Sequence, residues 1–213
     1  MGRKMDNTTI VKCITLFFIG LTTITAVIFY NKFENAKYAF NRNCYYRLEN
    51  LQSQTNEAVK KLDSAKTYKK VSESDVAEFV YLNSIIRSEQ WYIGLAAHDY
   101  QWKIGKLEKT YQGQGSFGII LDSYFEYLKQ TYKDKNYINY DKENEKIDLV
   151  FKYYQGIQKI LNGNLENVGN TGSLDKHELI NKEKWVLVSS EINKFDEDFK
   201  AQYSVELVSE KSK

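Results

Sequence analysis

The chain has 213 residues, of which 42% are hydrophobic and 27% charged, and its formal net charge is +2. This length is enough for one domain with its own core, and the composition excludes disorder as the default state. The chain contains no proline, although an average composition of about 5% would supply about ten. Because proline breaks helices and marks turns, its absence favours a few long helices over many short strands.

The first predicted element is a membrane-spanning helix over residues 13–30. They read CITLFFIGLTTITAVIFY, eighteen residues without a charge. As a helix rising 1.5 Å per residue, they would extend about 27 Å, close to the thickness of the hydrocarbon core of a bilayer. Basic residues precede this run and an aromatic residue closes it, as is typical of spanning helices: Arg3, Lys4, Lys12 and Tyr30.

A cleaved signal peptide is the alternative to a retained anchor. Its apolar region would usually be shorter, and small residues would precede the cleavage site. The following sequence, NKFENAKY, puts Glu34 at the −3 position of a cut after Ala36. We therefore expect a short N-terminal tail of residues 1–12 and a single-pass anchor that is retained.

The membrane orientation depends on a nearly even charge comparison. Lys32, Lys37 and Arg42 follow the apolar run, while three basic residues and the amino terminus precede it. The slight excess on the N-terminal side predicts a cell-membrane protein of the envelope whose C-terminal domain is extracytoplasmic, and a cytoplasmic domain remains the alternative.

The rest of the chain is electrically neutral, because 27 basic and 27 acidic residues remain once Arg3, Lys4, Lys12 and Asp6 are left out. A neutral domain has no electrostatic footprint for nucleic acid, so we expect no nucleic-acid partner. The small basic group at residues 66–70 is interpreted as a solvated turn between helices.

Residues 31–66 are predicted to form a stalk helix that continues from the anchor and joins the domain. Their apolar side chains recur every three or four residues, as on one face of a helix: Phe33, Ala36, Phe40, Cys44, Leu48, Leu51, Thr55, Ala58, Leu62 and Ala65. From Leu48 to Ala65 the spacing follows about two and a half heptads, fewer than a coiled coil needs. Packing within the monomer is therefore favoured, and a homodimer through the stalk helix remains the alternative.

Residues 67–208 are predicted to form a helical bundle, followed by a polar tail at 209–213. Ser72 and Asp75 have the spacing of a capping box before the second helix. The later apolar faces are Phe79, Leu82, Ile86, Ile93, Ala97, Tyr100, Ile104, Leu107 and Tyr111; Ile120, Tyr124, Leu128 and Thr131; Ile147, Val150, Tyr154, Ile157 and Leu161; and Trp185, Val188, Ile192, Phe195, Phe199 and Tyr203. The predicted fold is all-α: a transmembrane helix continuing into an extracytoplasmic antiparallel bundle of four to five long helices.

Glycine-rich stretches are interpreted as the ends of helices. GQGSFG at residues 113–118 matches G-x-G-x-x-G, but a helix precedes it, whereas a dinucleotide-binding site needs a strand there. We expect Gly113 and Gly115 to end the second helix and Ser116 to cap the third. NGNLENVGNTGS, from residue 162, is predicted to end the fourth helix, and Asp175 and Glu178 have the spacing of a second capping box.

The candidate binding residues lie in SEQWYIGLAAHDYQW, residues 88–102. On a helical wheel, Ile86, Ile93 and Ala97 share one side of the second helix. A second apolar stripe lies on the opposite side: Trp91, Leu95, His98 and Trp102. A helix that is apolar on two sides is usually interior, which we favour, or it presents one side to a ligand or partner.

The remaining chemical signals are few. The spacings of metal-binding histidines and the motifs of nucleophilic enzymes do not occur, so we expect no enzymatic activity, no metal and no cofactor. Glu89 falls near the core side of its helix, where a carboxylate more often reaches water than acts in catalysis. Cys44, the only cysteine beyond the anchor, is either a buried free thiol or forms an intermolecular disulfide.

Three classes of function are compatible with these residues. The favoured class is a membrane-anchored interaction or scaffold protein with an as yet unknown protein partner. The alternative is a ligand-sensing module that works with a separate signalling partner, because the layout resembles the membrane-proximal helical bundles of bacterial receptors in architecture, though in no motif. An envelope enzyme is the least favoured, since the motifs it would need are missing.

Overall fold

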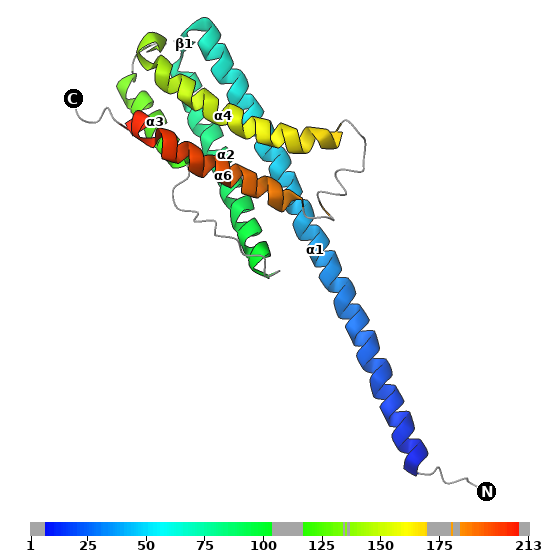
Figure 1. Cartoon of the computed structure of the whole chain (residues 1–213). Coiled ribbons are helices and arrows are strands. Elements are labelled where there is room, and N and C mark those ends of the chain that lie inside the picture. The colour runs from blue at the N-terminus through cyan, green and yellow to red at the C-terminus, as the bar shows by residue number, and fades with distance from the viewer. Residues whose placement is uncertain are drawn as a thin grey trace. The chain divides into compact units, whose positions relative to one another are not determined.

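The computed structural model describes residues 7–103, 117–133, 135, 137–169, 180 and 184–208, with the side chains of 7–10, 100–103, 139, 166–169, 205 and 206 left aside. Within these residues the chain forms five helices, coloured from blue to red along the chain in Figure 1. They are α1 (Asn7–Tyr68), α2 (Glu73–Lys103), α3 (Phe117–Thr131), α4 (Tyr140–Gly169) and α6 (Trp185–Val208). The predicted all-α class is confirmed.

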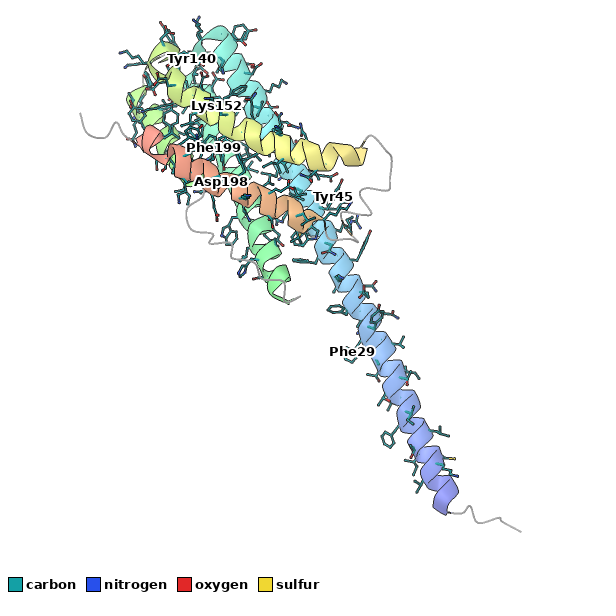
Figure 2. All side chains as sticks on the ribbon, viewed as in Figure 1. Phe29, Tyr45, Tyr140, Lys152, Asp198 and Phe199 are labelled. Atoms are coloured by element: carbon teal, nitrogen blue, oxygen red, sulfur yellow. The ribbon has the colours of Figure 1, made fainter. Side chains whose placement is uncertain are left out.

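The helices belong to two compact units, Met1–Arg42 and Asn43–Lys213. In the first unit, the part of α1 from Val11 contains the only stretch of the described chain that is long and apolar enough to cross a membrane. Its large apolar side chains are exposed and project outward from the helix, as Phe29 does in Figure 2. Threonine hydroxyls in this stretch donate to carbonyl oxygens one turn earlier, for example Thr15 to Val11 at 2.9 Å and Thr23 to Ile19 at 2.8 Å.

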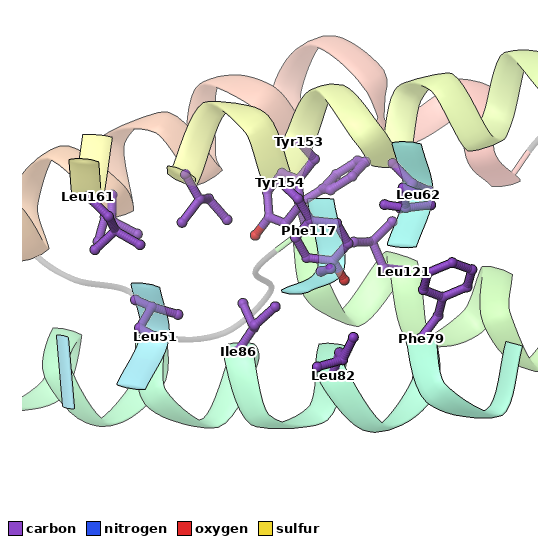
Figure 3. Close-up of a cluster of buried hydrophobic side chains, with 14 of the residues drawn as sticks. Leu51, Leu62, Phe79, Leu82, Ile86, Phe117, Leu121, Tyr153, Tyr154 and Leu161 are labelled. Carbon is purple, nitrogen blue, oxygen red and sulfur yellow. The ribbon is translucent and has the colours of Figure 1, made fainter. Parts of the chain in front are cut away.

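The core of the second unit forms where the predicted apolar faces meet. Seven residues of the predicted stalk face are buried: Cys44, Leu48, Leu51, Thr55, Ala58, Leu62 and Ala65. This part of the stalk face therefore packs against other helices of the same chain. The central residues of the faces predicted for α2, α3, α4 and α6 are buried as well. In Figure 3, Ile86 from α2, Leu121 from α3 and Tyr154 from α4 converge on the same interior.

Polar pairs along the seams set the direction in which helices pack. Arg47 and Lys61 of α1 pair with Glu89 and Glu78 of α2, so the residue numbers rise on one helix as they fall on the other. The seam between α1 and α4 has the same sense. Its pairs are Gln52 with Asn162 at 3.0 Å, Asn56 with Gln158 at 2.9 Å, and Lys66 with Asp148 at 2.8 Å. Both α2 and α4 therefore run antiparallel to α1.

The turn after α1 confirms two local predictions. Lys69 has a φ of 50°, a left-handed conformation that ends the helix. The predicted capping box follows: the backbone N–H of Ser72 donates to Asp75 at 2.7 Å, and the backbone N–H of Asp75 donates to the Ser72 hydroxyl at 3.2 Å. The sequence reading missed a small antiparallel pairing of β1 (Lys70–Val71) with β2 (Ile138–Asn139).

The fourth helix ends within the stretch that the sequence predicts, although well past its first residue. Helix α4 continues through the NGNLENVG sequence to Gly169. Leu161 and Leu165, one turn apart, are both buried, so burial on the helical face outweighs the turn preference of Asn and Gly in this stretch. The features predicted at Gly113, Gly115, Ser116, Asp175 and Glu178 lie outside the described residues, as do the core positions Ile104, Leu107 and Tyr111.

Candidate functional site

The second apolar stripe of α2 faces outward. Trp91 is 51% exposed and Leu95 38% exposed, and His98 is partly exposed. The expectation that this stripe is interior is therefore wrong for Trp91 and Leu95, while the side chain of Trp102 lies outside the described residues. We call Trp91, Leu95 and His98 the tryptophan face.

The opposite side of α2 explains this orientation. Ile86, Ile93 and Ala97 are buried, so the neighbouring helices already cover one side of α2. A helix that packs on one side leaves its other side in solvent. Which of two apolar stripes becomes buried depends on where the neighbouring helices lie.

Contacts with α1 hold this part of α2 in place. The Asn43 side-chain amide donates to the Tyr92 hydroxyl at 3.1 Å, and the Arg47 guanidinium lies over the Tyr92 ring at 3.6 Å. The tryptophan face therefore belongs to the end of the second unit that contains Asn43, which we call the Asn43 end. Other large hydrophobic side chains exposed on the described second unit are Tyr46, Tyr68, Tyr81, Ile119, Tyr137 and Leu187.

Glu89 has a structural role. One carboxylate oxygen accepts from Arg47 at 2.9 Å and the other accepts from the Asn50 amide at 2.9 Å. Because both oxygens bind side chains of α1, this carboxylate joins α2 to α1.

Cys44 lies in the core with no exposed surface. Burial raises the pKa of its thiol to about 12, although the positive charge of Arg47 opposes the shift. A neutral, buried sulfur reacts slowly, because the thiolate is the nucleophile. An intermolecular disulfide through Cys44 would require the sulfur to leave this core, so the structure favours the free-thiol alternative.

The sequence reading did not single out a polar cluster in the core around Asn83. The Asn83 amide donates to the carbonyl of Gly118 at 2.9 Å and to Asp122 at 2.6 Å, and its oxygen accepts from the Tyr154 hydroxyl at 2.8 Å. Asp122 also forms an ion pair with Arg87. These contacts join α2, α3 and α4 through groups that are each satisfied by a partner, which favours one arrangement of the helices over others.

A second buried polar cluster is centred on Asp196 of α6. Its oxygens accept from the backbone N–H of Phe117 at 3.2 Å, and the Tyr153 hydroxyl donates to it at 2.5 Å. Desolvation raises the pKa of Asp196 above its ordinary value of 3.8, while these hydrogen bonds lower it. The first N–H of α3 is thus capped by a residue 79 positions away along the chain.

The signal that could have identified these residues is a polar side chain at a core position. Asp196 lies four residues after Ile192 and three before Phe199, and Asn83 lies between Phe79 and Ile86 with the same spacing. A polar residue on an apolar face is either at its edge or buried with a partner. The partners come from other helices, so the sequence alone does not distinguish the two cases.

The described part of the chain contains no group of three or more His, Cys, Asp or Glu residues placed to hold a metal ion. The buried acids have structural partners: Glu143, for example, accepts from the hydroxyls of Tyr124 and Tyr132, each at 3.2 Å. No protein-family model matches the chain, and no curated protein or solved structure matches it significantly. A proposed function therefore depends on the residues of this chain.

Proposed function

We propose that the chain is a single-pass membrane protein of the cell envelope, anchored by residues 13–30, whose extracytoplasmic helical domain is a non-enzymatic interaction or scaffold module. One observation carries the proposal: a single helix, α1, contains both the uncharged run of residues 13–30 and the buried face from Cys44 to Ala65. The anchor is therefore part of the same helix that builds the domain core.

The chemistry of the N-terminal part of α1 supports a lipid environment. Its apolar side chains are exposed, which is unfavourable in water and favourable among lipid chains. Threonine is the only polar side chain type from residue 13 to residue 29 apart from Cys13. All four threonine hydroxyls there bond to the backbone of the same helix, so that they need no water as a partner.

The second argument for an interaction role is that the buried polar groups of the domain bind neighbouring helices. The buried carboxylates of Asp196 and Glu143 and the half-buried Glu89 bind side chains or backbone of neighbouring helices. These contacts stabilise the packing of helices, and the tryptophan face is one of the exposed apolar surfaces of the described second unit. A domain of this kind is suited to contact rather than to a reaction.

The anchor is tested by washing membranes with alkaline carbonate, where we expect the full chain to stay in the membrane pellet. The control variant carries Leu21→Arg and Ile24→Arg, because each charge near the middle of a spanning helix costs about 2.5–3.5 kcal/mol. This variant should be recovered in the soluble fraction or fail to accumulate. Release of the wild type by carbonate would contradict the anchor.

The interaction role is tested by chemical crosslinking in intact membranes, followed by identification of what is captured. We expect a protein that is captured by the wild type and lost with Trp185→Ala, a variant that removes the largest fully buried side chain of the core. Capture of a small molecule instead would favour the ligand-sensing alternative, and capture that is the same in both variants would count against a folded interaction module.

A further inference from the structure

We propose that Gln90, Tyr153 and Asp196 form a buried proton-binding site, in which a proton from the medium binds the carboxylate of Asp196 and reverses the hydrogen bonds that connect the three side chains. The three residues come from α2, α4 and α6 of the second unit. The inference goes beyond the proposed function, because it needs neither the anchor nor a partner. The site makes the packing of the domain sensitive to the pH of its surroundings.

The first observation is an unbroken chain of buried polar groups. The Gln90 amide of α2 donates to the Tyr153 hydroxyl of α4 at 3.5 Å, and this hydroxyl donates to Asp196 of α6 at 2.5 Å. Both oxygens of Asp196 also accept from the first N–H of α3, that of Phe117, at 3.2 Å each. Gln90 and Asp196 are 7% and 8% exposed, while Tyr153 and Phe117 are fully buried. The chain therefore joins four helices through groups that are shielded from water.

The direction of these hydrogen bonds is that of an ionised acid. Asp196 accepts hydrogen bonds at both oxygens, as a carboxylate does. The Tyr153 hydroxyl has a single proton and gives it to Asp196, so its oxygen accepts from the nitrogen of the Gln90 amide. The Gln90 oxygen, Oε1, is buried and has no hydrogen-bond partner among the described residues. No other donor in this part of the chain therefore holds the amide in its present orientation.

The same groups can bind a proton without shortening the chain of hydrogen bonds. A proton on the Asp196 carboxylate gives an O–H that donates to the Tyr153 oxygen, and the Tyr153 O–H turns from Asp196 to Gln90. Half a turn of the Gln90 amide brings Oε1 to the place of the nitrogen, where it accepts this bond. The second oxygen of Asp196 still accepts from the Phe117 N–H, so α3 keeps its cap. The buried negative charge is removed while each link of the chain is kept.

The surroundings of the chain favour the uncharged state, because they are apolar. Figure 3 shows Tyr153 in the interior of the domain. Three phenylalanine rings have their centroids within 5.9 Å of the centroid of the Tyr153 ring: Phe117, Phe195 and Phe199. Such rings do not solvate a carboxylate as water does, so the loss of its charge removes a desolvation cost.

The groups that face Asp196 explain the direction in which its pKa is displaced. Desolvation is the largest influence and raises the pKa of Asp196 above its ordinary value of 3.8, and the charge of Glu197 on the same helix acts in the same direction. The hydrogen bonds from Tyr153 and Phe117 and the charge of Lys200 lower this pKa. The groups that other helices bring directly against the carboxylate, the Tyr153 hydroxyl and the Phe117 N–H, are themselves uncharged.

The site is tested by carbon-13 NMR of the full chain in detergent, with the carboxyl carbons of the aspartate side chains labelled. The Asp196 signal is identified as the one that is missing from the spectrum of Asp196→Asn. We expect this signal to titrate with a midpoint above pH 3.8, the ordinary value for the group. A midpoint at or below this value would overturn the proton-binding site.

Gln90→Met distinguishes the hydrogen-bond chain from burial alone. Methionine is similar in shape but does not replace the amide oxygen as an acceptor, so the protonated state loses a hydrogen bond, whereas the ionised state loses only the long contact at 3.5 Å. We expect the proton affinity of Asp196 to fall about two- to tenfold, the effect of one hydrogen bond.

Burial alone predicts the opposite result for this variant. The loss of a polar amide would make the surroundings of Asp196 less polar, so its proton affinity would rise or stay the same. Either outcome would overturn the reversible chain. The matched control is Gln158→Met on α4, because Gln158 binds Asn56 of α1 instead, and it should leave the titration of Asp196 unchanged.

A second measurement decides the question even if Gln90→Met does not fold. Asp196→Asn cannot take up the proton, so the difference in stability between the wild type and this variant isolates the site. Because the pKa of Asp196 is raised in the folded state, the stabilisation by the proton is complete below pH 3.8 and is lost as the pH rises through the folded pKa. Urea unfolding in detergent should show the wild type gaining stability over Asp196→Asn as the pH falls. A difference that is constant with pH, or that decreases in acid, would overturn the inference.

Discussion

The hydroxyl of Tyr153 on α4 donates a 2.5 Å hydrogen bond to the buried carboxylate of Asp196 on α6, and the same carboxylate caps the first residue of α3. Asp196→Ala would leave the Tyr153 O–H and the Phe117 N–H without an acceptor. A buried unsatisfied group costs about 1–3 kcal/mol, so we expect a loss of about 3 kcal/mol in the free energy of unfolding. Urea unfolding of the full chain in detergent, followed by circular dichroism, measures this loss.

Two further variants control this experiment. Asp196→Asn keeps one acceptor oxygen and should lose less than Asp196→Ala. Asp198→Ala removes an exposed carboxylate from the same helix, and such surface changes stay within about ±0.5 kcal/mol. Equal losses for Asp196→Ala and Asp198→Ala would show that the Asp196 cluster does not stabilise the fold.

The stability of the domain should fall at alkaline pH. Desolvation raises the pKa of Tyr124, Tyr153 and Tyr154 above the ordinary value of 10.0, and nearby carboxylates reinforce the shift. These groups keep their protons in the folded state and lose them in the unfolded state, so the stabilisation is complete below pH 10 and is lost as the pH rises toward their folded pKa values. Tyrosinate absorbance should then appear together with the loss of helical circular dichroism.

Tyr153→Phe provides the comparison for the alkaline experiment. The variant should be less stable at neutral pH, because Asp196 loses a donor, but its stability should decrease less steeply above pH 10. Tyrosinate absorbance that rises fully while helicity is retained would contradict the burial of these three hydroxyls.

Cys44 should resist thiol reagents in the folded protein. With no exposed surface and a pKa raised to about 12, its thiol should react only when the domain unfolds. In a Cys13→Ser background, labelling in detergent should be slow and should increase many-fold in urea. Ser53→Cys together with Cys44→Ser places a thiol at an exposed position of the same helix and should label at once. A disulfide-linked dimer on a non-reducing gel that disappears with Cys44→Ser would support the intermolecular disulfide instead of the free thiol.

Two glycines of α4 should respond to alanine in opposite ways. A β-carbon at Gly156 would overlap the ring of Phe195, whereas one at Gly163 meets nothing within 4 Å. Gly156→Ala should therefore destabilise the domain by about 1–3 kcal/mol through overpacking. Gly163→Ala should stabilise it by about 0.5–1 kcal/mol, because alanine is the better helix former. A destabilising Gly163→Ala would contradict a helical conformation at this position.

Trp91 and Trp185 should differ in what their removal costs. Trp185 has no exposed surface and Trp91 is half exposed. Replacing a buried tryptophan with alanine costs about 3–5 kcal/mol, so Trp185→Ala should lose this much. Trp91→Ala should lose well under half as much in urea unfolding of the same detergent-solubilised chain. Comparable losses of stability would show that Trp91 is buried in the core and would contradict an exposed tryptophan face.

Much of the local structure was predictable because it depends on residues one or two turns apart. The spacing from Cys44 to Ala65 predicts a buried face, and Ser72 with Asp75 predicts the start of α2; the structure contains both. The stretch in which α4 ends was predictable, but the residue at which it ends was not. Asn and Gly favour turns by themselves, but the burial of Leu165 against other helices keeps the segment around Gly163 helical.

The sequence by itself determined the helical class, the apolar faces and the existence of two apolar stripes on α2. Only the tertiary structure decided that Ile93 faces inward and Trp91 outward, and that Asp196 caps a helix 79 residues away. The physical reason is the range of the interactions. Periodicity and caps are properties of a single helix, whereas the choice between two faces, or the partner of a buried carboxylate, depends on which other helices are present to cover them.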